Sequence, residues 1–156
     1  MKQREMVDVT KIVKNLRGEE MPLAFPTPQQ LEALPREKMK DSTGKEIELK
    51  TPDIKFLPKE TIRDVVLSCL GNYLVQDKKE GFYINSIADV ILNEDKVELK
   101  DKFRKFLIHV LEDQSYTVTK TKNAEGKETE ERKGLYLPWV IARILLEFGE
   151  KPEDME

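Results

Sequence analysis

The feature that most constrains the fold of this chain is a stripe of apolar residues with helical spacing that begins at residue 62. Thr61 and Asp64 stand three residues apart at its start, which is the spacing of a pair that caps the first helical turn. The stripe therefore predicts an amphipathic helix over about residues 62–76. Its members are Ile62, Val65, Val66, Cys69, Leu70, Tyr73 and Leu74.

Three further segments carry the same helical pattern. One covers about residues 85–93 and starts with Ser86 and Asp89 at the capping spacing, and the next covers about residues 100–113. The last begins near Pro138, which suits a first helical turn because its missing N–H needs no partner there, and it ends at Phe148. The chain thus predicts four helices after residue 57.

The first 56 residues lack such a pattern and contain four closely spaced prolines, Pro22, Pro26, Pro28 and Pro35. Proline removes a backbone donor and pushes the preceding residue toward extended geometry, so we predict a loop with at most one helical turn at 29–34. Alternating apolar and polar residues predict a short strand over 6–13. After a polar turn at 41–44, a second strand at 45–50 could pair with the first.

A β-hairpin is predicted over about residues 116–134, with a return strand that is charged on both faces. The sequence therefore predicts an α+β fold that is mostly helical. It has four helices, an N-terminal two-stranded element and a C-terminal β-hairpin before the last helix. We divide it into an N-terminal arm with a proline-rich loop, 1–56, a helical domain, 57–150, and an acidic tail, 151–156, and find no internal repeat.

Composition narrows the classes of function. The 156 residues include 27 Lys or Arg and 30 Asp or Glu, and a net charge of −3 does not indicate a general affinity for nucleic acid or anionic lipid. The one cysteine, Cys69, excludes an internal disulfide and a metal site built on thiolates of this chain. The charged N-terminus lacks the apolar segment of a signal peptide, so we expect a cytoplasmic protein.

Residues with catalytic or metal-binding chemistry are sparse. The sequence has no glycine-rich phosphate loop, no nucleophile elbow and no histidine pair at metal-ligand spacing. We interpret the single histidine, His109, as a packing or surface residue, because it lies at the edge of an apolar stripe. Cys69 lies within a stripe and is interpreted as a core residue. We expect no cofactor, no metal ion and no enzymatic activity. An enzyme with an unrecognised acidic site is the least favoured alternative.

The most apolar stretch, residues 134–150, is too short to span a membrane and contains a charged Arg143. On a helical wheel one face carries the expected core stripe of Leu137, Val140, Ile141, Ile144, Leu145 and Phe148. The opposite face carries Trp139, Ala142, Arg143 and Leu146. Such a helix is either sandwiched under the N-terminal arm or presents a strip to a partner protein, and Trp and Arg are enriched in interface hot spots.

A second candidate surface is basic. The predicted third helix carries Lys100, Lys102, Arg104 and Lys105 outside its apolar stripe, and the mixed-charge hairpin with residues 120–133 follows. This order could form a winged-helix-like transcription regulator that contacts DNA or RNA polymerase. Residues 96–133 hold only ten Lys or Arg against eight Asp or Glu, so nucleic acid is not the favoured partner.

The order of four segments resembles a family of small, uncharacterised bacteriophage proteins. The segments are VDVTKIVKNLRGEEM, TIRDVVLSCLGNYL, VELKDKFRKFLIHVLED and LYLPWVIARILLE, and residues 22–43 and 116–133 depart from the family pattern. The resemblance brings no catalytic residues and implies a non-enzymatic accessory role in the host cytoplasm. We therefore expect a protein-binding accessory factor that acts on a phage assembly protein or a host protein, of unknown oligomeric state.

Overall fold

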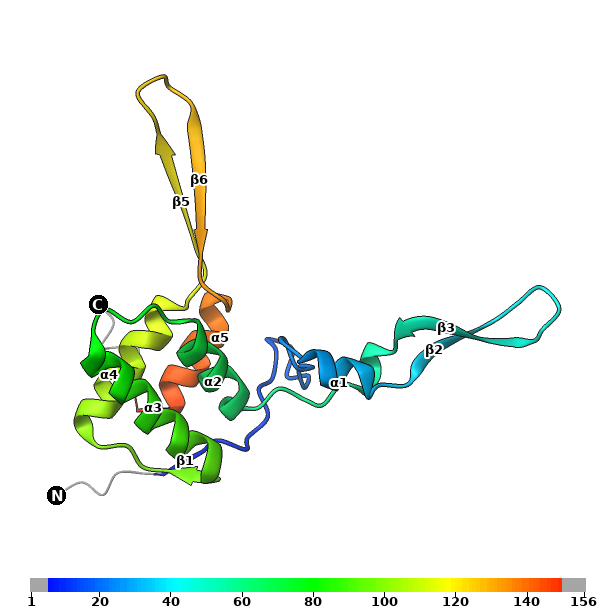
Figure 1. The fold of residues 1–156 in the computed structure, drawn as a ribbon, viewed down its shortest axis with the longest axis horizontal. Helices are drawn as coiled ribbons and strands as arrows, with labels where there is room; N and C mark the ends of the chain where they lie inside the picture. The colour runs from blue at the N-terminus through cyan, green and yellow to red at the C-terminus, as the bar shows by residue number, and fades with distance from the viewer. Residues whose placement is uncertain (1–5, 150–156) are drawn as a thin grey trace. The chain divides into compact units, whose positions relative to one another are not determined.

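The computed structural model describes residues 6–149 and confirms an α+β fold (Figure 1). The chain forms two compact units, which we describe separately: unit 1 combines residues 6–11 with 62–149, and unit 2 comprises residues 12–61. The backbone N–H of Ile62 donates to the carbonyl oxygen of Lys11 at 3.0 Å. Unit 2 is therefore an insertion into unit 1, and the residues that flank it, Lys11 and Ile62, are hydrogen-bonded to each other. The boundary predicted from the sequence lies after residue 56 instead of residue 61.

Unit 1 contains four helices that pack around one apolar core. They are α2 (Ile62–Asn72), α3 (Lys78–Asn93), α4 (Asp101–Asp113) and α5 (Pro138–Glu147). Helix α2 packs against α3 and α4, and α4 packs against α5. Removal of the apolar stripes from water, worth about 25 cal/mol per Å², is the main source of stability. The core includes Val65, Val66, Ile87, Ile91, Leu107, Leu111 and Ile144.

The boundaries of α2 and α3 differ from the prediction. Helix α2 ends at Asn72 instead of residue 76, and the predicted stripe member Leu74 is exposed. Helix α3 begins seven residues before position 85, because the side chain of Asp77 accepts the backbone N–H of Glu80 at 2.9 Å and caps the first turn. Ser86 lies inside α3 and is not a cap.

Unit 1 also contains a two-stranded pairing between residues far apart in the sequence. Strand β1 (Val7–Asp8) pairs antiparallel with β4 (Lys96–Val97). The predicted pairing of residues 6–13 with 45–50 is therefore wrong. Val7 and Val9 are buried in unit 1, where the helical core supplies the apolar contacts that this segment needs.

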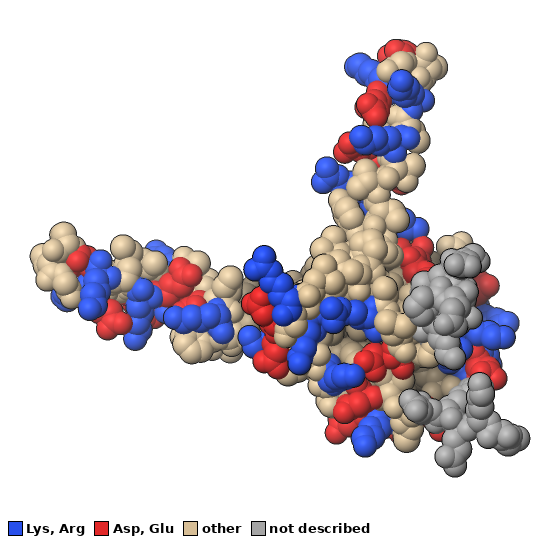
Figure 2. Space-filling model, turned by 180° about the vertical axis from the view of Figure 1, so that it is seen from behind, with Lys and Arg blue, Asp and Glu red and all other residues tan. Residues whose placement is uncertain are grey.

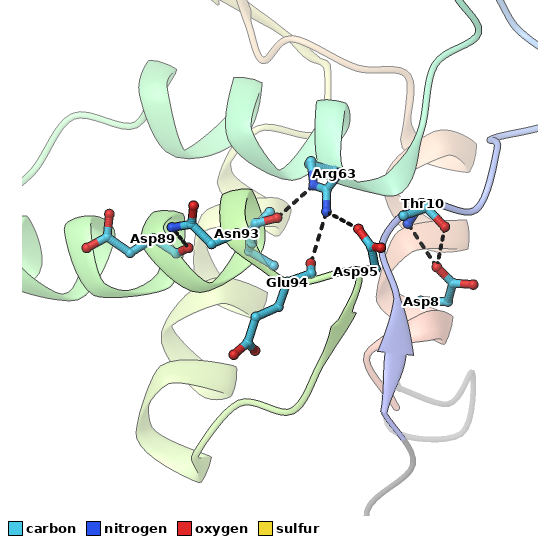
Figure 3. A network of polar contacts seen from close by, with 8 residues as sticks. Asp8, Thr10, Arg63, Asp89, Asn93, Glu94 and Asp95 are labelled. Carbon is cyan, nitrogen blue, oxygen red and sulfur yellow. Dashed lines mark hydrogen bonds and ion pairs between the residues drawn. The ribbon is translucent and has the colours of Figure 1, made fainter.

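The guanidinium group of Arg63, in the first turn of α2, fixes the end of α3 (Figure 3). Its Nε donates to the carbonyl oxygen of Ile91 at 2.8 Å, and its Nη2 donates to the carbonyl oxygen of Glu94 at 3.0 Å. The same Nη2 contacts the Asp95 carboxylate at 3.0 Å. A cation at these carbonyls is favourable because they form the negative end of the helix dipole.

Unit 2 has a small core. The single helix α1 (Pro28–Glu32) begins with a capping box between Thr27 and Gln30 and is followed by strands β2 (Arg36–Lys40) and β3 (Glu46–Pro52) and the 3-10 turn η1 (Ile54–Phe56). Its buried apolar side chains are Val13, Leu23 and Leu34. Six large apolar side chains are exposed instead: Leu16, Phe25, Met39, Ile47, Ile54 and Phe56.

Each unit contains one long β-hairpin, which we call a ribbon (Figure 1). The first ribbon, in unit 2, consists of β2 and β3, and the second, in unit 1, consists of β5 (Thr117–Lys122) and β6 (Glu128–Lys133). The predicted hairpin at 116–134 is thus confirmed, and its two strands are exposed along their whole length. The strand predicted at 45–50 exists, but its partner is β2. The turn between them closes this local hairpin at a low entropy cost.

Candidate protein-binding surface

Helix α5 has one buried face, as the wheel predicts. Pro138 occupies its first turn and Phe148 is its C-cap. Val140, Ile141, Ile144, Leu145 and Phe148 are buried. The assignment of Leu137 to this stripe is wrong, because Leu137 is the extended N-cap residue and its side chain is 53% exposed. The helical period does not apply before the helix begins.

The other face of α5 carries the four residues predicted to bind a partner. Trp139 and Ala142 are half-buried, and Arg143 and Leu146 are exposed, with Leu146 at 52%. The Arg143 guanidinium carbon lies 5.6 Å from the centroid of the Trp139 ring, within the range of a cation–π interaction. This contact orders both side chains into one surface beside Leu146. The structure therefore brings the predicted residues together on one helix face.

The C-terminal end of this helix is held by two polar contacts within unit 1. Glu147 forms an ion pair with Lys11 at 2.8 Å, and this hydrogen bond raises the pKa of Lys11. At the C-terminus, Nε of Arg104 donates to the carbonyl oxygen of Phe148 at 2.7 Å. A cation at the C-terminal carbonyls complements the helix dipole. The surface is thus carried by a helix whose C-terminal end is held by Lys11 and by Arg104 of α4.

The four basic candidates on α4 do not share one role. Arg104 is half-buried and caps α5, whereas Lys100, Lys102 and Lys105 are exposed. The Lys102 ammonium lies 5.1 Å from the centre of the Phe103 ring and 5.9 Å from that of Tyr83. On the face drawn in Figure 2, Lys and Arg side chains lie among Asp and Glu. The sequence did not reveal the structural contact of Arg104, since it joins residues 44 positions apart.

A pocket of about 490 Å³, lined by several polar and charged residues, lies at the base of the second ribbon. Its lining includes Tyr73, whose hydroxyl donates to the Glu80 carboxylate at 3.2 Å, and Lys133, which contacts Asp113 at 2.9 Å. Burial and the neighbouring Glu80 raise the pKa of Tyr73. His109 lies at its exposed rim and meets the Tyr73 ring edge-on. Sequence reasoning missed this pocket, because it joins three helices and the ribbon.

Within residues 6–149, no group of three or more His, Cys, Asp or Glu is placed to hold a metal ion. Cys69 is buried in the α2 stripe, as the sequence indicated. No helix of the described segment is long and apolar enough to cross a membrane.

The chain was also compared with models of protein families, with curated proteins and with solved structures. None of the three comparisons gives a match. The functional assignment therefore depends on the surfaces described above.

Proposed function

We propose that this chain is a non-catalytic, phage-encoded accessory factor that binds another protein through the outer face of α5. The partner is either a phage assembly protein or a host protein, met in the host cytoplasm. The observation that carries the proposal is the ordered pair of Trp139 and Arg143, 5.6 Å apart, beside the half-exposed Leu146. Trp and Arg dominate protein interfaces because they bury a large area and keep a polar group for the partner.

The energetics of this face favour a protein ligand. The contact between Arg143 and Trp139 already restricts these two side chains, so association loses less free energy in ordering them. An exposed leucine next to a tryptophan adds apolar area that a partner removes from water, at about 25 cal/mol per Å². Arg143 supplies donors at the edge for a carboxylate or a carbonyl of the partner.

The test uses affinity capture from infected and uninfected host lysate, followed by binding of the purified partner. We expect to recover a partner that binds the wild-type chain. Its affinity for the Trp139→Ala and Leu146→Glu variants should be at least about tenfold lower. The control is Leu92→Glu on α3, where the leucine is 60% exposed and lies outside the proposed surface. If Leu92→Glu lowers the affinity as much as the α5 variants do, α5 is not the binding surface.

The single tryptophan gives a second, direct readout. With 5-fluorotryptophan at position 139, the chain has one fluorine resonance, since Trp139 is the only tryptophan. Addition of the purified partner is expected to shift or broaden this resonance, because docking changes the environment of the ring. A resonance unchanged at saturating partner would contradict the proposed site.

A further inference from the structure

The tips of the two ribbons are a repeat that becomes visible only in the structure. Residues 40–48 and 122–130 share the pattern Lys-(Asp/Asn)-x-x-Gly-Lys-Glu-x-Glu. Asp41 Oδ1 accepts the backbone N–H groups of Thr43 and Lys45, at 2.8 and 3.0 Å. Asn123 Oδ1 accepts those of the equivalent residues at 3.0 and 2.9 Å. The absence of an internal repeat inferred from the sequence is therefore corrected.

The repeat extends to the strand register and arranges charges in rows. In the first ribbon Lys38 lies opposite Glu48 and Lys40 opposite Glu46. In the second, Lys120 lies opposite Glu130 and Lys122 opposite Glu128. Residues two apart share a face of a strand, so each ribbon has one face with a lysine row on its first strand and a glutamate row on its second. Figure 2 shows Lys and Arg interspersed with Asp and Glu along both ribbons.

Each ribbon has edge strands that could pair with a further strand. In the part of the chain that the structure describes, each is a separate two-stranded sheet, so β3 and β5 are edge strands with backbone groups free to pair. An isolated two-stranded hairpin is marginally stable in water, and additional strands stabilise it. The ion pairs inside the ribbons join exposed side chains at 3.5 to 4.0 Å, so they contribute little to stability and leave the charges accessible.

We propose that two copies of this chain associate through their ribbons, with β3 of one copy beside β5 of the other. Strand β3 runs away from its tip and β5 runs toward its own, so the edges are antiparallel when both tips point the same way. This arrangement places Glu46 and Glu48 of one copy beside Lys122 and Lys120 of the other. The four strands then carry alternating rows of lysine and glutamate.

The charge rows select against inverted arrangements of the two ribbons. The turns and strand registers of the two ribbons are equivalent. When each charged face is viewed with its tip upward, the strand that carries the lysine row therefore lies on the same side in both ribbons. Inverting one ribbon would therefore place a glutamate row beside a glutamate row, or lysine beside lysine. Like charges directly opposite each other destabilise a sheet. Each β3–β5 contact therefore joins two copies of the chain.

The test is a charge-swap mixing experiment with full-length chains, followed by sedimentation equilibrium at low ionic strength. The first variant is Glu46→Lys with Glu48→Lys, and the second is Lys120→Glu with Lys122→Glu. We expect wild type to dimerise and each variant alone to associate at least about tenfold more weakly, because four like charges then meet at each contact. An equimolar mixture should associate more tightly than either variant alone, since β3 of the first variant and β5 of the second then carry opposite charges. The like charges that now lie opposite each other within each altered ribbon are the same in the mixture as in its components, so they do not affect this comparison.

Three outcomes would overturn this inference. One is a wild-type chain that stays monomeric at high concentration and low salt, and another is a mixture that associates no better than its components. A second variant that dimerises like wild type would show that the second ribbon takes no part in the contact. Far-ultraviolet circular dichroism that matches wild type confirms that the helices of both variants are intact. The α5 surface is untouched by these changes, so this test and that of the proposed function are independent.

Discussion

The first and second ribbons have the same tip and the same register near the tip, but they are joined to very different supports. The second ribbon starts and ends on the helical core, where the carbonyl oxygen of the buried Gln114 accepts the N–H groups of Leu135 at 2.9 Å and Tyr136 at 3.2 Å. Tyr116 donates back to the carbonyl oxygen of Tyr136 at 2.7 Å. These bonds hold the two strand ends together beside α4.

The first ribbon stands on unit 2, which buries three apolar side chains and exposes six large ones. Its base is held by the bond from the Asp53 N–H to the carbonyl oxygen of Pro35, at 2.8 Å. Because the two ribbons share a tip but stand on different supports, a short local pattern is sufficient to form a ribbon and to set its register. The stability of the support depends instead on the core beneath it, which no local pattern specifies.

The largest expected effect concerns the base of the second ribbon. Gly134 has φ of 105°, and an added Cβ would lie 2.5 Å from the carbonyl oxygen of Ser115. We expect Gly134→Ala to lower the free energy of unfolding by about 3 kcal/mol or more, because strain and a backbone clash add. Urea unfolding followed by Trp139 fluorescence measures this loss in unit 1.

The matched control for that variant lies at the tip of the same ribbon. Gly126 also has a positive φ, 78°, but an added Cβ would meet nothing within 4 Å. Gly126→Ala should therefore cost only about 1 kcal/mol, the usual penalty for a side chain in the left-handed region. Equal losses for the two glycines would show that the base relaxes freely and is not a rigid support.

Much of the fold could be predicted because its signals are local. The helical stripes, the turn chemistry and the hairpin at 116–134 are each contained within a few turns or one loop of sequence. The β1–β4 pairing could not be predicted, since Val7 and Val97 are 90 residues apart and two-residue strands carry no pattern. Strand β2 was missed because REKMK is almost wholly charged and lacks an apolar alternation.

The candidate site shows the same division. A helical wheel is sufficient to place Trp139, Arg143 and Leu146 on one face, and the structure has them there. The wheel failed at Leu137, where the helix has not yet begun. The repeated tip escaped notice in the sequence, because its variable positions read Ser-Thr in one ribbon and Ala-Glu in the other. Equivalent hydrogen bonds reveal the repeat where identity is partial.

A smaller expected effect is a difference between the two tips in how their stability depends on pH. Hydrogen bonds from Thr43, and from the backbone of Lys45, lower the pKa of Asp41 below its usual 3.8. Since the folded pKa lies below the unfolded one, this stabilisation is complete above about 3.8 and is lost as the pH falls through the folded value. Asn123, at the equivalent position, does not titrate. Acid should therefore loosen the first tip before the second.

Amide hydrogen exchange at Thr43 and Lys45, compared with Glu125 and Lys127, measures this difference between pH 7 and acid. Both ribbons carry a glutamate row in the same register, so the comparison between tips isolates Asp41. Asp41→Asn is the matched control and should make the first tip respond like the second. A pH difference that persists in Asp41→Asn would assign the effect to another group.

The smallest expected effect comes from exchanging one uncharged cross-strand pair between the two ribbons. Met39 lies opposite Ile47 in the first ribbon, where both are partly exposed, and Thr121 lies opposite Thr129 in the second, with 2.7 Å between their hydroxyl oxygens. We expect Met39→Thr with Ile47→Thr to lower the local opening free energy of the first ribbon by about 0.5 kcal/mol, since an apolar cross-strand pair is replaced. Amide exchange along β2 and β3, at protein concentrations that keep the chain monomeric, measures the change.

The reverse exchange, Thr121→Met with Thr129→Ile, should stabilise the second ribbon by less than the first exchange costs, because it also removes the hydrogen bond between the two hydroxyls. If the opening free energy falls in the first ribbon and rises in the second, the cross-strand pair acts in the same way on either support. A loss confined to the first ribbon, with no change in the second, would show instead that the apolar pair serves the small core of unit 2. The ribbons would then be equivalent only at their tips.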